Sequence, residues 1–169
     1  MEVHQDINEE IIVKELMKYK EHPIYRIAIT GGPCAGKSTA LTTISKYFSK
    51  AGFHVMVVPE IPTIVAHGGG LKDFYSFGSK DRMHFQLDLI KLKIYFEDYI
   101  AKLADMAKKP TLILCDRGIV DCAAYMSGEE YQALLDESGW TWSYVRDKRY
   151  DSVIFMNTAA KGAEEYYTL

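Results

Sequence analysis

Short apolar runs alternate along the chain with longer segments whose apolar residues recur at helical spacing. The short runs are continuous and rich in β-branched residues, a composition typical of buried parallel strands. These runs are residues 25–30, 53–58, 111–115 and 150–157. The segments with helical spacing are residues 37–50, 80–108, 119–126 and 128–137,. This alternation predicts an α/β fold, in which a parallel sheet lies between two layers of helices and the crossovers are right-handed.

The segment 80–108 is the longest predicted helix, and it carries two apolar rows. Two rows give a broad apolar face, so we expect this helix to be well buried. The rows are Met83, Leu87, Ile90 and Ile94, and Phe85, Leu89, Leu92, Phe96, Tyr99 and Leu103. The stretch 59–79 before it contains two prolines and three consecutive glycines, which predict a loop,.

Both ends of the chain differ from this alternation. Residues 2–20 have apolar residues at near-helical spacing and precede Pro23, so residues 1–23 are predicted to form an N-terminal helical extension,. We expect residues 1–169 to form a single domain. The sequence stops after the fourth strand with no further strand, so we expect the C-terminal part of the fold to be missing.

Residues 31–38 read GGPCAGKS and match the phosphate-loop pattern GxxxxGK[ST] between a predicted strand and a predicted helix,. Glycines let the backbone curl until successive N–H groups point at one anion. The helix that follows directs its positive end at the same anion. A glycine turn that precedes Lys-Ser by coincidence is the alternative. We predict that the loop holds the phosphates of a nucleoside triphosphate through Gly32, Pro33, Cys34, Ala35, Gly36, Lys37, Ser38 and Thr39.

Three side chains of the loop have expected roles. Lys37 reaches the β- and γ-phosphates, and the Ser38 hydroxyl ligates Mg²⁺. Thr39 is placed to bond the α-phosphate. Cys34 lies inside the loop, where it is either a small filler or a thiol open to oxidation.

Charged residues follow the second and third predicted strands. Glu60 comes after the second strand, and Asp116 and Arg117 follow the third. Ligands of α/β sheets bind at this carboxyl edge, so Glu60 could accept a proton from an acceptor hydroxyl or hold Mg²⁺ through water. Asp116 suits Mg²⁺ through water, and Arg117 suits phosphoryl oxygens. The alternatives are a solvated glutamate and a surface salt bridge. The predicted catalytic residues are Lys37, Glu60, Asp116 and Arg117, and the predicted metal ligands are Ser38 and Asp116.

Composition and charge narrow the class of protein. The net charge is -3, without the basic surplus of a general nucleic-acid binder, so no nucleic-acid partner is expected,. Three cysteines without a CxxC pair fit reduced thiols and a cytoplasmic location,. The charged N-terminus lacks a signal-peptide core, and no run approaches the roughly 20 apolar residues of a transmembrane helix.

Sequence motifs also separate the kinds of phosphate-loop protein. The chain lacks the NKxD and DxxG motifs of Ras-type GTPases, and it is too short for the lid and sensor arginines of a hexameric motor. A small kinase-like P-loop NTPase of three-layer α/β/α architecture is the remaining prediction.

Six motifs together resemble the P-loop domain of the TRPL translocation defect protein family, grouped with the nicotinamide riboside kinase domain as an AAA-type ATPase/kinase domain. The motifs are ITGGPCAGKST, VVPEIPTIV, HGGG, CDRG, RDKRYDSVI and GAEEYYTL. The resemblance runs from Tyr25 to the last residue and implies binding of ATP or GTP. In that family a CYTH-type domain that binds phosphorylated or acidic ligands usually follows, so a further domain or protein partner is expected.

The layout is also similar to deoxynucleoside and thymidylate kinases. Their Phe-Gln pair resembles Phe85-Gln86, which implies that Gln86 reads a base edge; a satisfied or exposed helix residue is the alternative. Their arginine-rich lid after the fourth strand has no counterpart here, since no arginine follows Arg149. Arg146 and Arg149 could approach the phosphates, or they could form a structural pair with Asp147 or Asp151.

Two functions remain open from the sequence. One is Mg²⁺-dependent phosphoryl transfer from ATP or GTP to a small hydroxyl-bearing acceptor, or slow hydrolysis of the nucleotide. The other is a non-catalytic nucleotide switch that is read by a second domain or partner.

Overall fold

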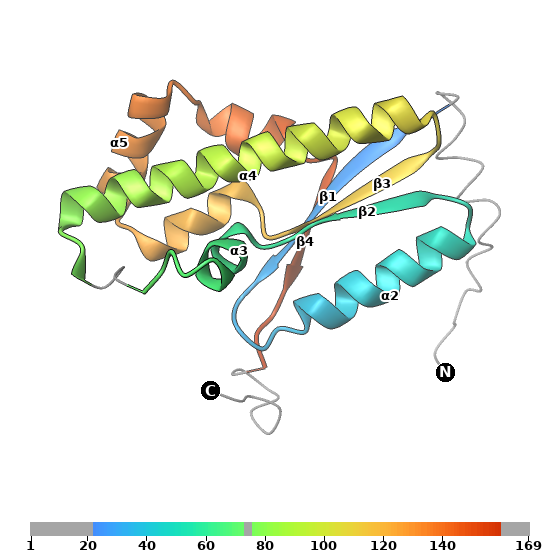
Figure 1. Cartoon of the computed structure of the whole chain (residues 1–169), viewed down its shortest axis with the longest axis horizontal. Helices are drawn as coiled ribbons and strands as arrows, with labels where there is room; N and C mark the ends of the chain where they lie inside the picture. Colours follow the sequence, from blue (N-terminus) through green and yellow to red (C-terminus); the bar gives the residue numbers. More distant parts are fainter. Residues whose placement is uncertain (1–21, 73–75, 160–169) are drawn as a thin grey trace, which may run out of the picture.

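The computed structural model describes residues 22–72 and 76–159. A parallel sheet lies between α2 on one face and the long α4 on the other (Figure 1). The strands are β1 (Ile24–Gly31), β2 (His54–Val58), β3 (Thr111–Asp116) and β4 (Ser152–Met156). The helices are α2 (Lys37–Lys50), α3 (Ile61–His67), α4 (Ser79–Ala107), η2 (Ile119–Tyr125), α5 (Gly128–Ser138) and η3 (Ser143–Lys148). The predicted three-layer α/β/α architecture is confirmed.

The strand order in the sheet is β2-β3-β1-β4, and every pair is parallel. The register pairs Ile29 of β1 with Asp116 of β3, and Gly31 with Met156 of β4. The carboxyl ends of the strands therefore meet at one edge. The phosphate loop and the residues that follow β2 and β3 all leave the sheet at this edge,.

Alternate residues of β3 point to opposite helical layers, as the two-residue period of a strand requires. Leu112 and Leu114 pack with Leu41 of α2, whereas Ile113 and Cys115 pack with Ala104 of α4. All five residues of this strand before Asp116 are buried. A strand covered on both faces explains why its sequence is apolar throughout rather than alternating.

The secondary structure differs from the prediction in three places. The stretch expected as a loop contains α3, in which Pro62 lies in the first turn, where a proline needs no hydrogen-bond partner,. Residues 119–125 form a 3₁₀ helix rather than an α-helix. A π-helix spans Ser143–Lys148, where no helix was predicted. The proposed helix over residues 2–20 lies outside the described residues.

The expectation that α4 is well buried was only partly right. Leu87 and Ile90 of its first row are buried in the core. Leu92 and Tyr99, both assigned to the second row, are 43% and 48% exposed. Two apolar rows at helical spacing cover more of a helix surface than one neighbouring layer can bury, so part of the second row faces outward. No helix among the described residues has the length and apolarity needed to cross a bilayer.

Candidate functional site

The phosphate loop connects β1 to α2 in a conformation that requires its glycines at two positions. Gly31 has φ 140°, and a Cβ there would lie 2.2 Å from the carbonyl oxygen of Met156, so β4 passes too close for any side chain. Gly36 has φ 79° and immediately precedes α2. Cys34 is exposed and is also left-handed, with φ 53°. These turns curl the chain around the amino end of α2.

The amino end of α2 presents backbone donors to this loop. The first helical hydrogen bond runs from Ala40 N to Gly36 O, at 2.9 Å. Within the described part of the chain, the amides of Lys37, Ser38 and Thr39 have no acceptor. Ser38 and Thr39 are both exposed. Free amides at a helix amino end form an anion site, because they lie at the positive end of the helix dipole.

Lys37 folds back across the loop. Its Nζ donates to the carbonyl oxygens of Gly31, at 2.9 Å, and Gly32, at 2.7 Å. Partial burial and the neighbouring Arg117 guanidinium lower the pKa of Lys37. The ammonium is thus held near the loop, where an anion would restore its preference for the charged form.

Arg117 joins the loop to the second strand. Its Nε donates to Oε1 of Glu60, and its NH1 donates to the same Gly31 carbonyl at 3.3 Å. Glu60 also accepts a hydrogen bond of 2.7 Å from the hydroxyl of Thr63. Burial alone raises the pKa of Glu60, but the bonds from Thr63 and Arg117 outweigh it and hold that pKa below its usual value. The carboxylate of Glu60 is therefore ionised and oriented.

Asp116 is the last residue of β3 and lies beside Glu60 and Arg117. Its Oδ1 is buried and has no hydrogen-bond partner among the described residues. Burial and the nearby Glu60 carboxylate raise the pKa of Asp116. A buried carboxylate oxygen without a protein donor suits a water shell or a hard cation such as Mg²⁺. Asp116 therefore fits a magnesium ion, and Ser38 remains the second predicted ligand, since a P-loop site supplies few protein ligands,.

A cavity of about 390 Å³ opens beside these charged groups. Glu60, Asp116 and Arg117 form its polar end, and Gln86 lies in its wall. The rest of the lining is largely apolar and includes Phe85, Leu89, Ile90, Ile119, Cys122 and Tyr125. Burial raises the pKa of the Cys122 thiol to about 12, so this thiol is uncharged at neutral pH, and Lys93 and Asp121 add charged groups to the lining. A mostly apolar cavity with a few converging polar groups is the usual form of a small-molecule site.

Residues that the sequence did not single out also hold this region together. Asp121 accepts hydrogen bonds from the Thr30 hydroxyl and, at 2.8 Å, from Gly118 N, so it fixes the turn after β3 to β1. An acidic residue three positions after Gly118 is a helix-capping signal that could have been found,. Lys93 lines the cavity from α4, and it belongs to neither apolar row of that helix, so no sequence pattern marked it.

Arg149 lies neither at the phosphate loop nor beside Asp151. It is buried and pairs with Glu97 and Asp98, not with Asp151 or the phosphate loop. Asp151 instead accepts a hydrogen bond from Arg26 N at 2.7 Å. Gln86 lies in the cavity wall and is partly buried. Its role as a reader of a base edge remains a prediction.

A family model described as an AAA domain matches residues 26–167. The chain belongs to this AAA domain family. The match supports the broader resemblance to an AAA-type kinase-like domain. The narrower one, to the TRPL translocation defect and nicotinamide riboside kinase group, remains a prediction.

A solved structure supports the same fold. This AAA domain is similar to thymidylate kinase from Ehrlichia chaffeensis, with a TM-score of 0.57 and 20% identity over 85% of this chain and 80% of that one. The structure of APE1195 aligns over 87% of this chain and 91% of that one, with 16% identity and a TM-score of 0.34. No curated protein has significant sequence similarity to the chain. The domain is therefore a kinase-like, nucleotide-binding P-loop NTPase fold.

Proposed function

We propose that this AAA domain binds ATP or GTP with Mg²⁺ and transfers the terminal phosphoryl group to a hydroxyl of a small, nucleoside-like acceptor. The observation that carries the proposal is the cavity whose polar end is Glu60, Asp116 and Arg117. Arg117 also reaches Gly31 of the phosphate loop. An acceptor in the cavity and a triphosphate in the loop would thus meet at one arginine.

The phosphate loop holds the donor in this proposal. The amides of Lys37, Ser38 and Thr39 bind phosphate oxygens, and the Lys37 ammonium leaves the loop carbonyls to bind the β- and γ-phosphates,. Ser38 and Asp116 are the residues that would hold Mg²⁺, which would neutralise charge on the phosphates. The unused buried oxygen of Asp116 supports this assignment.

The acceptor side would work by orientation rather than by strong base catalysis. A bond forms between the acceptor hydroxyl oxygen and the γ-phosphorus, while the bond from that phosphorus to the β–γ bridging oxygen breaks and leaves a nucleoside diphosphate. Glu60, whose pKa is lowered, accepts the hydroxyl hydrogen bond and then the proton, which passes on to solvent,. Arg117 stabilises the charge on the transferring group. Charge stabilisation and positioning supply most of the catalysis in phosphoryl transfer.

A nucleotide switch is the second candidate, and the resting position of Lys37 favours it. Both loop carbonyls that Lys37 binds must be released before a triphosphate can enter. The loop therefore has two arrangements that bound nucleotide would distinguish, which is what a partner domain could read.

Product analysis separates the two candidates. The full chain is incubated with Mg-ATP or Mg-GTP and a panel of nucleosides, and the products are identified by mass spectrometry. A phosphorylated nucleoside that disappears in Glu60→Gln, but persists in the exposed Glu129→Gln control, supports transfer. Slow release of orthophosphate alone supports the switch. Neither product, despite nucleotide binding, contradicts any catalytic role.

A further inference from the structure

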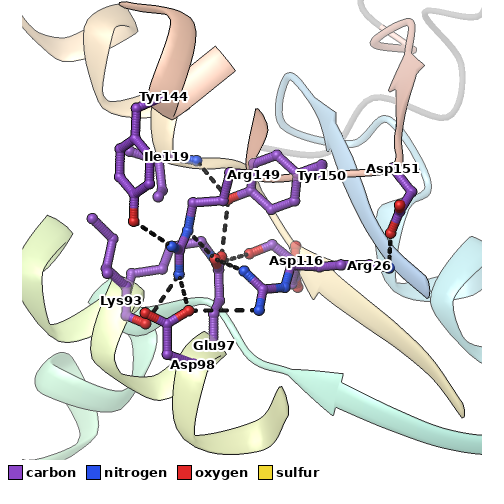
Figure 2. Close-up of polar contacts among 11 residues, drawn as sticks. Arg26, Lys93, Glu97, Asp98, Asp116, Ile119, Tyr144, Arg149, Tyr150 and Asp151 are labelled. Atoms are coloured by element: carbon purple, nitrogen blue, oxygen red, sulfur yellow. Dashed lines mark hydrogen bonds and ion pairs between the residues drawn. The ribbon is translucent and has the colours of Figure 1, made fainter. Parts of the chain in front are cut away.

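A group of charged residues is buried behind the turn that carries Asp116 and Arg117. Glu97, in the middle of α4, has a fully buried side chain, and the side chain of Arg149 is 3% exposed. Figure 2 shows both residues converging with Lys93, Arg26 and Tyr150. We call this group the Glu97 cluster; its members are Arg26, Lys93, Glu97, Asp98, Arg149 and Tyr150.

Glu97 and Arg149 form the centre of the cluster. Oε2 of Glu97 accepts from Nε of Arg149 at 2.7 Å, and Oε1 accepts from the Tyr150 hydroxyl at 2.9 Å. The other nitrogens of Arg149 donate to Asp98 and Ile94 O, and to the Tyr144 hydroxyl at 2.8 Å (Figure 2). Each nitrogen of the buried guanidinium therefore has an acceptor, so the arrangement is rigid.

Two residues of the cluster form hydrogen bonds with the backbone of the turn. Lys93 Nζ donates to the carbonyl oxygen of Asp116 at 3.1 Å and pairs with Glu97 at 3.5 Å. The amide of Ile119 donates to the Tyr150 hydroxyl oxygen at 3.0 Å. These two points flank Arg117, whose φ of 67° is left-handed. Such a conformation is unfavourable for a residue with a side chain, so the flanking bonds offset a local strain.

Stability alone gives a weak reason for this arrangement. Burying charges carries a desolvation penalty, and well-packed apolar residues often stabilise a core equally well or better. Apolar side chains at positions 93 and 150 could fill the same space, but they could not bind the backbone of Asp116 and Ile119. The polar contacts to the turn are what the charged cluster adds.

We propose that the Glu97 cluster fixes the 116–119 turn, and that Tyr150 is the positioning residue that couples it to the turn. Tyr150 joins both parts, because its hydroxyl accepts from Ile119 N and donates to Glu97. The cluster thereby sets where the Asp116 carboxylate and the Arg117 guanidinium point. The effect on turnover rests on the proposed function; the effect on the turn itself does not.

Three tyrosine-to-phenylalanine substitutions in the full chain test the proposal. Tyr150→Phe removes the hydroxyl that binds the turn. Tyr144→Phe removes a hydroxyl that, within the described part of the chain, binds Arg149 and no other residue. Tyr131→Phe removes a buried hydroxyl that has no partner among the described residues, and it serves as the matched control. The readouts are amide hydrogen exchange at Ile119 by NMR, nucleotide affinity by calorimetry, and phosphoryl transfer or orthophosphate release.

We expect exchange at Ile119 to rise at least about tenfold in Tyr150→Phe alone. We expect its turnover to fall by about 10- to 100-fold, the size of a small misplacement at a reacting centre. Nucleotide affinity should change less than about threefold, because the phosphate loop is untouched. A merely structural role would leave turnover at the wild-type level at temperatures where the variant is folded.

Unchanged exchange at Ile119, or raised exchange with wild-type turnover, overturns the proposal. If the wild-type chain shows no turnover, the proposed function fails. Hydrogen exchange at Ile119 then still decides whether the cluster fixes the turn. Lys93→Met replaces Tyr150→Phe if the latter does not fold, with exchange read at Arg117 and Gly118. Wild-type exchange at both residues in folded Lys93→Met overturns the proposal as well.

Discussion

Arg117 at the end of β3 donates a hydrogen bond to Glu60 at the end of β2, and Arg117 also reaches the carbonyl oxygen of Gly31. One guanidinium thus ties three segments of the carboxyl edge together. The side chains of Glu60 and Arg117 are 30% and 21% exposed, so this pair lies where a ligand can reach it. The hydrogen bond from Thr63 and this contact with Arg117 together hold the pKa of Glu60 below that of a free glutamate.

The Glu60–Arg117 pair predicts an acid-dependent loss of stability. Since the pKa of Glu60 in the fold lies below 4.5, its ionised form stabilises the fold above that pH, and this stabilisation is lost as the pH falls through the lowered value,. Glu60→Gln should lower stability by about 1 kcal/mol at pH 7, or about 2–4 °C in Tm. The difference should shrink as the pH falls below 4.5 in thermal unfolding monitored by circular dichroism.

The exposed ion pair between Arg146 and Asp147 gives a control. Asp147→Asn removes the same charge on the surface and should leave Tm unchanged. A Glu60→Gln difference that does not shrink as the pH falls would show that shape, not charge, causes the loss.

The raised pKa of Asp116 predicts the opposite effect of pH on stability. Burial and Glu60 raise its pKa, so its ionised form is disfavoured in the fold, and the penalty is present at neutral pH and relieved as the pH falls,. Asp116→Asn should therefore raise Tm at pH 7, with a smaller gain near pH 4. The same variant should lose the effect of Mg²⁺ on nucleotide affinity, as measured by calorimetry with Mg²⁺ or with EDTA. A lower Tm at pH 7, or an intact Mg²⁺ effect, would contradict the role of Asp116.

Substitutions at two glycines distinguish the cost of backbone strain from the cost of a steric clash. Gly52 has φ 91° with open space around it, whereas Gly31 has φ 140° and lies against Met156. Gly52→Ala should cost about 1–2 kcal/mol through strain alone. Gly31→Ala should cost about 1–3 kcal/mol more, because β4 must move to admit the methyl group. Urea unfolding of both variants measures the difference, and equal losses would mean that β4 does not press on the loop.

Much of the fold could be predicted from the sequence because the signals were local. The buried strand β3 is a continuous apolar run, and the phosphate loop has a fixed spacing between a strand and a helix. Helix α3 was missed because Pro59, Pro62 and the three glycines favoured a loop, although Pro62 lies in a first turn that tolerates it. The π-helix has no local signal of its own, since its residues also suit an α-helix or a turn.

Candidate site residues could be predicted only where charged side chains lie at the carboxyl end of a predicted strand. Glu60, Asp116 and Arg117 follow strands, and the parallel sheet brings them together. Glu97 and Arg149 are separated by 52 positions, and nothing near either residue indicates that they pair in the interior. Such long-range pairs depend on how α4 packs against the segment before β4, which the pattern of either element alone does not contain.

The account depends most on the phosphate loop, and Lys37→Ala tests it directly. Calorimetry with Mg-ATP and Mg-GTP compares the wild-type chain with this variant and with Lys46→Ala, an exposed lysine on the same helix. Loss of a charged hydrogen bond of about 1.5–3 kcal/mol predicts roughly 10- to 150-fold weaker binding in Lys37→Ala. Lys46→Ala should bind as the wild type does. Unchanged affinity in Lys37→Ala, or an equal loss in both variants, would contradict the account.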